Sequence, residues 1–276
     1  MLSLIHLSSY RSIYALILLL VYVDDVIITG IEPRVINELV IALDSKFALK
    51  DLGQLHYFLG VQLHTVPNGV LLNKKKYIED LLHRLDLGDL KPAPSPSVLY
   101  KQLSISYGTS LDDPYIYWST IGALQYLTSM RPNTVKRVLR YVSGTRHFGL
   151  YIQHGSDLSV STFSDADWEA NIDNRKSVAT YCIFLGGNLV SWSSKKQSVV
   201  ARSNTESEYR ALASAFAEII WVQQLLSEIG FKHKLAPVLW CDNLRADALA
   251  VNPVFHVQTK NIEIDIHFVC DQVLSG

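Results

Sequence analysis

The 276-residue sequence has few cysteines, little excess charge and no long apolar run, and each shortage excludes a class of protein. Its three cysteines, Cys182, Cys241 and Cys270, are too far apart for a disulfide framework or the paired spacing of a zinc site. We therefore expect a reducing, intracellular compartment, either cytoplasmic or nuclear. The net charge of −1 gives no chain-wide positive field, so nucleic-acid binding would depend on local Lys and Arg clusters.

The strongest apolar segment, Ile13 to Val23, is about half the ~20 residues that a membrane-spanning helix requires. Its β-branched residues, and the pair Asp24 and Asp25 directly after it, favour a buried strand over a targeting segment. We therefore expect no signal peptide, no transmembrane segment and no membrane partner.

Hydrophobic residues make up 49% of the chain, enough for one large or two ordinary domains. After Asp24 and Asp25 a second apolar strand ends at Gly30, which predicts a β-hairpin with both carboxylates at its turn. Pro33 then opens a helix that should lie against the sheet. The apolar residues of this helix recur at the spacing of one buried face: Ile36, Leu39, Val40 and Leu43.

Residues 55–72 predict two strands around the turn Pro67-Asn68-Gly69, followed by a second amphipathic helix. Lys74, Lys75 and Lys76 begin this helix and would face solvent or phosphate. Its inward positions are Ile78, Leu81, Leu82 and Leu85.

Three alternating prolines between Lys91 and Ser97 predict a stiff linker and a domain boundary. Residues 112–150 then have a helical pattern, and strands resume near Leu158. From there the expected order is three strands, a long helix, a strand, a helix, a short strand and a helix. This order predicts an α/β fold, with helices packed on a mixed sheet. The helical stretch holds the densest basic cluster: Arg131, Lys136, Arg137 and Arg140.

Four carboxylates in the second half stand where secondary structure would bring them together. Asp165 and Asp242 lie at the carboxyl ends of the predicted strands 161–165 and 238–242. Parallel pairing of these strands would set the two side by side, because sites in such sheets gather at that edge. Glu208 in the long helix and Asp265 at the start of the last helix complete the set.

Glu206 and Glu208 cannot both face the sheet, because two residues turn a helix by about 200°. Glu208 lies one turn before Leu212 on the apolar stripe, so it is the candidate and Glu206 is expected to face solvent. The segment from Thr205 to Glu208 also fits a capping box, so capping remains an alternative role for Glu208.

Clustered carboxylates repel one another unless a metal ion neutralises them, and Mg²⁺ is the natural occupant, with Mn²⁺ as an alternative. Two ions about 3.5–4 Å apart could activate a water and stabilise the leaving oxygen during cleavage of a phosphodiester. The sequence offers no convincing Ser-His-Asp or Cys-His pattern and no Gly-rich phosphate loop as rival chemistry.

The chain carries a series of motifs in a fixed order: Tyr22 to Asp25, Phe47 to Gly53, His56 to Gly60, Gly122 to Leu127, Ser164 to Trp168, Ser191 to Gln197, Glu208 to Leu212, Trp240 to Asn243 and Ile262 to Asp265. In this order they resemble the Pol polyprotein of copia-type retrotransposons over almost the whole chain. The resemblance implies a reverse-transcriptase palm end and thumb over residues 1–90 and a linker over 91–110. A connection region over 111–157 and a ribonuclease H-like domain over 158–276 follow.

The resemblance implies that Asp24 and Asp25 are the paired metal-binding aspartates of the polymerase, the alternative being a plain acidic turn. The segment from His56 to Leu63 resembles the part that grips the primer end. In the ribonuclease H part, the resemblance implies catalytic and metal-binding roles for the same four carboxylates: Asp165, Glu208, Asp242 and Asp265. Asp167 and Asp173 are less favoured substitutes.

Departures from the family pattern limit what we expect of the chain. A third polymerase aspartate lies upstream in the family, so polymerisation should be absent here. The region between Arg131 and Val135 lacks roughly two helical turns that the family carries. Asn261 stands where the family usually has a histidine, and the chain stops soon after the last helix begins. We expect these last two changes to weaken turnover without removing metal binding.

Two hypotheses follow. The first is a magnesium-dependent nuclease that cuts the RNA strand of an RNA–DNA hybrid, with other Pol-derived subunits as further partners. Its phosphate contacts would come from Lys and Arg side chains that otherwise form a solvated face: Lys74, Lys75, Arg137, Arg140, Lys195 and Lys196. The second is an inert remnant or a non-catalytic nucleic-acid-binding module with exposed apolar strands.

Overall fold

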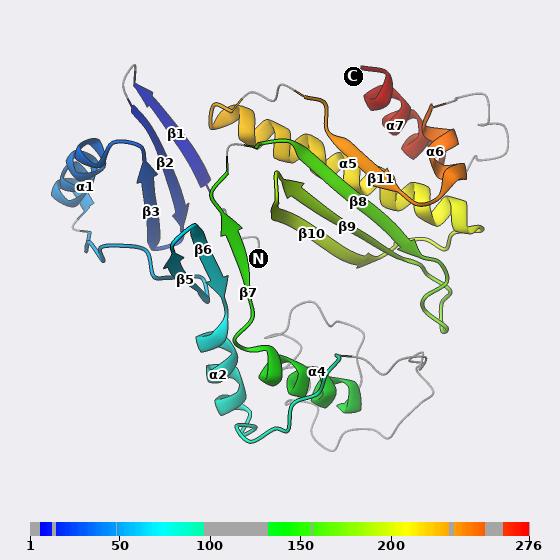
Figure 1. Cartoon of the computed structure of the whole chain (residues 1–276), viewed down its shortest axis with the longest axis horizontal. Coiled ribbons are helices and arrows are strands. Elements are labelled where there is room, and N and C mark those ends of the chain that lie inside the picture. The colour runs from blue at the N-terminus through cyan, green and yellow to red at the C-terminus, as the bar shows by residue number, and fades with distance from the viewer. Residues whose placement is uncertain are drawn as a thin grey trace. The chain divides into compact units, whose positions relative to one another are not determined.

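The computed structural model describes residues 6–12, 15–47, 49–96, 132–155, 157–231, 235–251 and 262–275 (Figure 1). The chain divides into two compact units. The first comprises Met1–His56 with Trp221–His233, and the second comprises Tyr57–Ile220 with Lys234–Gly276. All four predicted ribonuclease H carboxylates belong to the second unit.

The first unit contains an antiparallel sheet of β1 (His6–Ser12), β2 (Ala15–Tyr22) and β3 (Asp25–Gly30), in that order. The predicted hairpin is confirmed, because β2 pairs with β3 around Val23 and Asp24. Val23 has a φ of 51°, a region that β-branched residues rarely adopt. The sequence did not predict β1. The expected burial of the apolar segment is largely wrong, since Ile17 alone among its described residues is buried.

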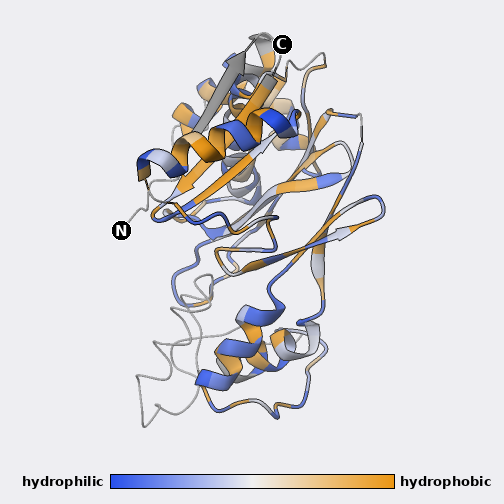
Figure 2. Cartoon of the chain, turned by 90° about the vertical axis from the view of Figure 1, so that its left-hand side faces the viewer, coloured by the Kyte–Doolittle hydropathy of each residue, from blue (hydrophilic) through white to orange (hydrophobic). Residues whose placement is uncertain are grey.

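Helix α1 (Pro33–Phe47) begins at the predicted proline and contacts β3. Figure 2 shows its hydrophilic and hydrophobic residues alternating along the helix beside the hydrophobic strands of this unit. The four predicted apolar positions are half-buried: Ile36, Leu39, Val40 and Leu43. The hydrophobic spacing therefore predicted both the helix and the face that it turns inward.

The second unit begins with a small antiparallel sheet of β4 (Tyr57–Phe58), β5 (Val61–Val66), β6 (Gly69–Asn73) and β7 (Gly149–Gln153). The turn at Pro67 and Asn68 joins β5 to β6 as predicted. The prediction of helix through residue 150 is wrong, since β7 starts at Gly149. This strand forms because Leu150 and Ile152 alternate with exposed residues and pair with Leu72 and Val70 of β6.

Helices α2 (Lys75–Arg84) and α4 (Pro132–Thr145) pack together through Leu81, Leu82 and Leu139. Figure 2 shows separate hydrophilic and hydrophobic faces on these helices. The predicted linker contacts α4: Arg137 Nη2 donates to Ser95 Oγ at 2.9 Å and Arg140 Nε donates to the Lys91 carbonyl at 2.7 Å. The linker thus joins segments that pack on each other. Its residues 97–110, and the junction at Arg131, lie outside the described residues.

The second sheet of this unit contains β8 (Val160–Asp167), β9 (Val178–Leu185), β10 (Asn188–Lys196) and β11 (Val238–Cys241). The strand order is β10-β9-β8-β11, with β11 parallel to β8 and the other pairs antiparallel. The helices are α5 (Asn204–Glu228), α6 (Leu244–Val251) and α7 (Glu263–Ser275). This mixed sheet with helices confirms the predicted α/β class. The predicted short strand after α6 falls on residues 252–261, outside the described part.

The core of this region lies between the helices and one face of the sheet. Tyr209 and Leu212 of α5 join Ala246 of α6 and Ile266 of α7 in one buried cluster, against which Cys241 of β11 packs. Figure 1 shows α5 running alongside β8 and β11. No helix in the described ranges is long and apolar enough to cross a membrane.

The opposite face of the sheet is exposed and apolar. Trp192, Cys182, Phe163 and Trp240 stand in register across the four strands. Trp192 and Trp240 are 60% and 57% exposed, so this row adds apolar surface to the open face.

Candidate metal centre

The parallel pair β8 and β11 places two of the predicted carboxylates at one edge of the sheet. Cys241 is in register with Ser164, so Asp242 follows β11 beside Asp165. The predicted parallel pairing is confirmed. Asn243 then caps the N-terminus of α6, because its Oδ1 accepts hydrogen bonds from the backbone N–H groups of Arg245 and Ala246 at 3.1 Å each. Asp242 is thereby held at the junction between strand and helix.

The start of α5 is set by Ser203 and Glu206. Ser203 Oγ accepts a hydrogen bond from the Glu206 backbone N–H at 3.2 Å, and the Glu206 carboxylate accepts one from the Arg202 N–H at 2.9 Å. Glu206 also pairs with Arg210 at 3.1 Å and is 8% exposed. The prediction that Glu206 faces solvent is therefore wrong. The capping role that remained open for Glu208 belongs to Glu206, because the helix begins two residues earlier than the capping-box pattern from Thr205 to Glu208 indicated.

Glu208 lies on the buried side of this candidate site, as its position on the apolar stripe predicted. Its side chain is 3% exposed, and its carboxylate accepts a hydrogen bond from the backbone N–H of Ala166. Its Oε2 atom accepts no hydrogen bond from the described part of the chain. Burial, followed by the negative charges of Asp165 and Asp242, raises the pKa of Glu208 from 4.5 to about 7.

Cys241 is a member of the centre that the sequence interpretation missed. Ligand atoms of Glu208, Cys241 and Asp242 all lie within 4.8 Å of one another. Strand alternation could have found Cys241, since Trp240 and Asp242 are exposed and the residue between them must face α5. Burial is the main cause that raises the pKa of the Cys241 thiol, and the carboxylates of Glu208 and Asp242 add to it.

Asp165 approaches this centre from the exposed side. It shares one face of β8 with the exposed Phe163, whereas Ser164 and Ala166 are buried on the other face. Its charge nonetheless contributes to the raised pKa of Glu208. Strand β11 ends opposite Ser164, so it does not extend beside Asp165 and Ala166 of β8. At this point Asp165 lies on one face of β8, and Glu208 accepts the hydrogen bond from Ala166.

Asp265, at the start of α7, contacts Arg210 of α5. Its Oδ2 is 3.6 Å from Nη1 of Arg210, the residue that also binds Glu206. Burial raises the pKa of Asp265, and the charge of Arg210 opposes this effect. Asp265, like Asp165, is absent from the group of close ligand atoms among the described residues. The roles of both as metal ligands stay predictions. Asn261 lies outside the described residues.

Two loops hold the centre in place. Trp168, just after β8, donates from its indole N–H to the Ala201 carbonyl at 3.2 Å. Gln197 donates from its side chain to the Ser207 carbonyl at 2.8 Å, and from its backbone N–H to the Ser177 carbonyl at 2.9 Å. These bonds tie the end of β8 and the loop before α5 to the first turn of that helix.

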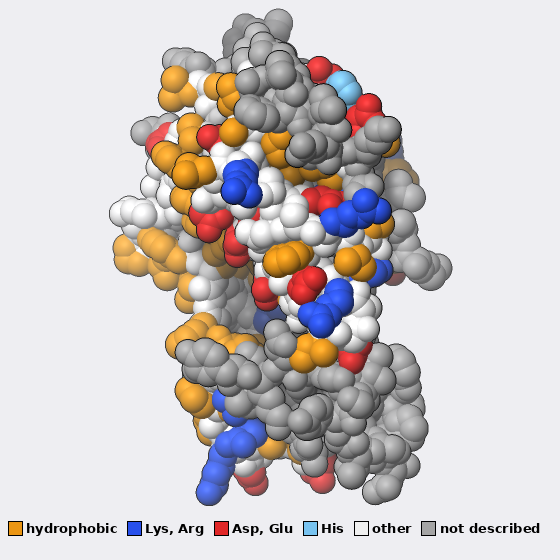
Figure 3. Space-filling view, turned by 90° about the vertical axis from the view of Figure 1, so that its right-hand side faces the viewer, with side chains coloured by type: hydrophobic (Ala, Val, Ile, Leu, Met, Phe, Trp, Pro, Cys, Tyr) orange, Lys and Arg blue, Asp and Glu red, His pale blue; other side chains and the backbone are white. Residues whose placement is uncertain are grey.

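The predicted phosphate contacts fall into two groups. Lys195 and Lys196 at the end of β10 are exposed, as is Lys74, while Lys75 is half-buried. Arg137 and Arg140 instead hold the linker segment through their hydrogen bonds to Ser95 and Lys91. Figure 3 shows acidic side chains interspersed with Lys and Arg side chains on the face that it views. Arg137 is half-buried and Arg140 is exposed.

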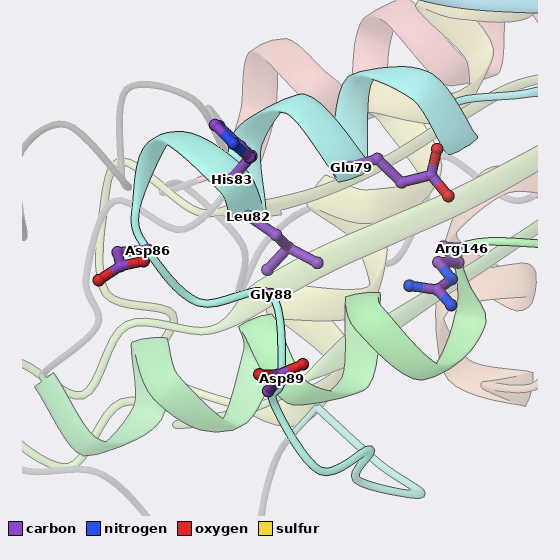
Figure 4. Close-up of a pocket in the computed structure, with 7 residues that line it drawn as sticks. All are labelled: Glu79, Leu82, His83, Asp86, Gly88, Asp89 and Arg146. Carbon is purple, nitrogen blue, oxygen red and sulfur yellow. The ribbon is translucent and has the colours of Figure 1, made fainter.

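The other candidate positions lie on elements that contribute no residue to the group of Glu208, Cys241 and Asp242. Asp24 and Asp25 are exposed at the β2–β3 turn in the first unit. A cavity of about 470 Å³ lies between α2, the loop after it and Arg146 (Figure 4). Its charged lining mixes Glu79, Asp86 and Asp89 with Arg146. This cavity includes none of the residues predicted as ligands or phosphate contacts.

Comparisons with known proteins place the chain in a family. Residues 9–99 match the family of reverse transcriptases (RNA-dependent DNA polymerases). The chain is 40% identical, over 95% of its length, to the retrovirus-related Pol polyprotein from transposon RE1 of Arabidopsis thaliana. It is 32% identical, over 93% of its length, to that from transposon TNT 1-94 of Nicotiana tabacum. The chain spans about a fifth of each polyprotein, 19% and 22% respectively.

A shorter relative matches over nearly its whole length. The chain is 43% identical to an uncharacterized mitochondrial protein of Arabidopsis thaliana, over 74% of the chain and 93% of that protein. No solved structure matches the chain. Sequence identity over most of the chain and the reverse-transcriptase match together show that it belongs to the family of copia-type retrotransposon Pol polyproteins.

Proposed function

We propose that this part of the Pol polyprotein hydrolyses the RNA strand of RNA–DNA hybrids with the help of divalent metal ions. The observation that supports this most is Glu208, a buried carboxylate with a free oxygen that lies close to Asp242 and within electrostatic range of Asp165. Folding places these negative charges together at a cost that no described cation offsets. Such an arrangement is typical of a site built to bind cations.

The residues present fit Mg²⁺ or Mn²⁺. Both ions prefer carboxylate oxygens, and Asp165, Glu208 and Asp242 supply them from two strand ends and one helix. When bound, the ions would supply an activated water and charge stabilisation at the scissile phosphate. The chain itself positions the three carboxylates, excludes water from Glu208 and presents Lys195 and Lys196 to the backbone of the nucleic acid.

The test uses the full 276-residue chain and a hybrid labelled on its RNA strand, with Mg²⁺ or Mn²⁺ added. We expect RNA cleavage that Asp242→Asn and Asp165→Asn each reduce at least about a hundredfold, because each removes a ligand. Asp167→Asn is the comparison, since Asp167, a less favoured substitute, is an exposed residue on the same face of β8 as Asp165 and should lose less activity. A folded wild-type chain that leaves the RNA intact with both metals would refute the proposal.

The second candidate function is hybrid binding without cleavage. The position of Asp265 favours it, because this carboxylate contacts Arg210 and, unlike those of Asp165 and Asp242, is not among the charges that raise the pKa of Glu208. Fluorescence anisotropy with the same hybrid separates the two functions. Binding without cleavage, unchanged by Asp242→Asn, would identify a binding module.

A further inference from the structure

The thiol of Cys241 gives the metal centre a ligand that differs chemically from its carboxylates. The sulfur lies within 4.8 Å of a ligand oxygen of both Glu208 and Asp242. In the described residues, no other group of three or more His, Cys, Asp or Glu side chains brings ligand atoms this close. Thiolates favour soft cations such as Zn²⁺ and Cd²⁺, whereas carboxylates accept both hard and borderline ions.

Glu208 provides independent support for a ligand at this position. Its Oε2 atom is buried and accepts no hydrogen bond from the described residues, although a buried carboxylate oxygen is normally paired. The backbone fixes the positions of the other two residues of the group. Cys241 ends β11, and Asp242 is followed directly by Asn243, which caps α6. A cation between these side chains would pair with the orphaned oxygen.

We propose that Glu208, Cys241 and Asp242 form a mixed carboxylate–thiolate site that binds thiophilic divalent cations in competition with Mg²⁺. This inference deepens the proposed function, on which it rests for the metal-binding roles of Glu208 and Asp242. Three protein ligands and one open position for water are the usual set of a zinc ion outside structural sites. The thiol proton leaves to solvent when the sulfur binds the ion.

The geometry requires only a small adjustment. Metal–sulfur distances of about 2.3 Å and metal–oxygen distances of about 2.1 Å in a tetrahedral site separate ligand atoms by about 3.5 Å. The ligand atoms of Glu208, Cys241 and Asp242 now lie up to 4.8 Å apart. A rotamer change of the exposed Asp242 side chain can shorten these distances.

The test is direct binding of Cd²⁺ to the full chain, followed by the ultraviolet charge-transfer absorption of a cadmium–thiolate bond. We expect the absorption to saturate with one ion and to disappear in Cys241→Ser. Glu208→Gln should weaken Cd²⁺ affinity at least about tenfold, because it replaces a charged ligand by an amide. Cys182→Ser is the matched control, since Cys182 is half-buried on β9 between Phe163 and Trp192 in the register. Circular dichroism verifies that each variant folds.

This readout separates the two proposals. An absorption that is missing in the wild type, or that persists in Cys241→Ser, overturns the mixed site even if Mg²⁺-dependent cleavage is observed. An absorption that follows Cys241 supports the mixed site even if the chain cleaves no RNA. Where cleavage is observed, Zn²⁺ should inhibit it in the wild type and at least about tenfold less strongly in Cys241→Ser.

Discussion

Glu206 and Glu208 lie two residues apart on α5, yet their carboxylates have opposite environments. Glu206 accepts a hydrogen bond from the Arg202 N–H and pairs with Arg210, so its charge is stabilised. Glu208 is buried near the charges of Asp165 and Asp242, so its charge is opposed. One carboxylate stabilises the start of the helix, while the other carries an electrostatic cost that a bound cation would relieve.

The first prediction concerns the pH dependence of stability without metal. The pKa of Glu208 is raised from 4.5 to about 7 in the folded chain, mainly by burial. Its favourable contribution is complete below pH 4.5 and is lost as pH rises to about 7, because the folded state must then ionise a buried group. The loss is at most about 3 kcal/mol for a pKa raised from 4.5 to about 7. Urea denaturation at pH 5 and pH 8 measures it.

Glu208→Gln removes this titration and should make the metal-free chain more stable than the wild type at pH 8. Added Mg²⁺ should reverse the ranking, since only the wild type retains the ligand charge. If the difference in stability between the wild type and Glu208→Gln is the same at pH 5 and pH 8, burial and the neighbouring charges do not oppose the ionisation of Glu208.

The second prediction concerns Glu206. Glu206→Ala removes the hydrogen bond to the Arg202 N–H and the pair with Arg210, so we expect a loss of about 1 kcal/mol in the free energy of unfolding. Glu206→Gln keeps an acceptor for that N–H and should lose less. Metal affinity should change little in both variants. If these substitutions change the free energy of Cd²⁺ binding more than the free energy of unfolding, Glu206 belongs to the candidate metal centre.

Local patterns in the sequence predicted the elements whose formation depends on near neighbours. The hairpin around Asp24 and Asp25, the helix α1 that begins at Pro33 and the buried position of Glu208 all follow from spacing within a few residues. The start of α5 did not follow, because the segments from Ser203 to Glu206 and from Thr205 to Glu208 both fit a capping box, and local spacing does not decide between them.

Two other differences have the same cause. Strand β7 forms by pairing with β6, which lies far away in the sequence. The pattern around Leu150 alone is also compatible with a helix, so local spacing did not predict this strand. Asp265 pairs with Arg210 across two helices, a tertiary contact that no local spacing reveals. Local sequence patterns therefore predicted the two strand ends of the candidate site but not the ion pair between Arg210 and Asp265.

The third prediction separates the basic residues. Lys195 and Lys196 are exposed, so replacing both by Ala should weaken hybrid binding and reduce its salt dependence by about one unit of slope for each phosphate that the variant no longer neutralises. Arg137→Ala is the comparison, because Arg137 donates to Ser95 of the linker. That variant should lose about 1 kcal/mol of stability and keep the salt slope of the wild type. Equal slopes in all three proteins would remove Lys195 and Lys196 from the interface.

The fourth prediction concerns Asp265, which the sequence interpretation and the structure treat differently. The carboxylate contacts Arg210, so Asp265→Asn should weaken this ion pair and leave Cd²⁺ and Mg²⁺ affinity within about threefold of the wild type. Asp242→Asn should reduce the same affinities at least about tenfold, because Asp242 belongs to the group of close ligand atoms. Isothermal titration of both variants under identical conditions measures the difference. If Asp265→Asn loses as much affinity as Asp242→Asn, the start of α7 must move toward β8 when metal binds, and Arg210 must then release Asp265.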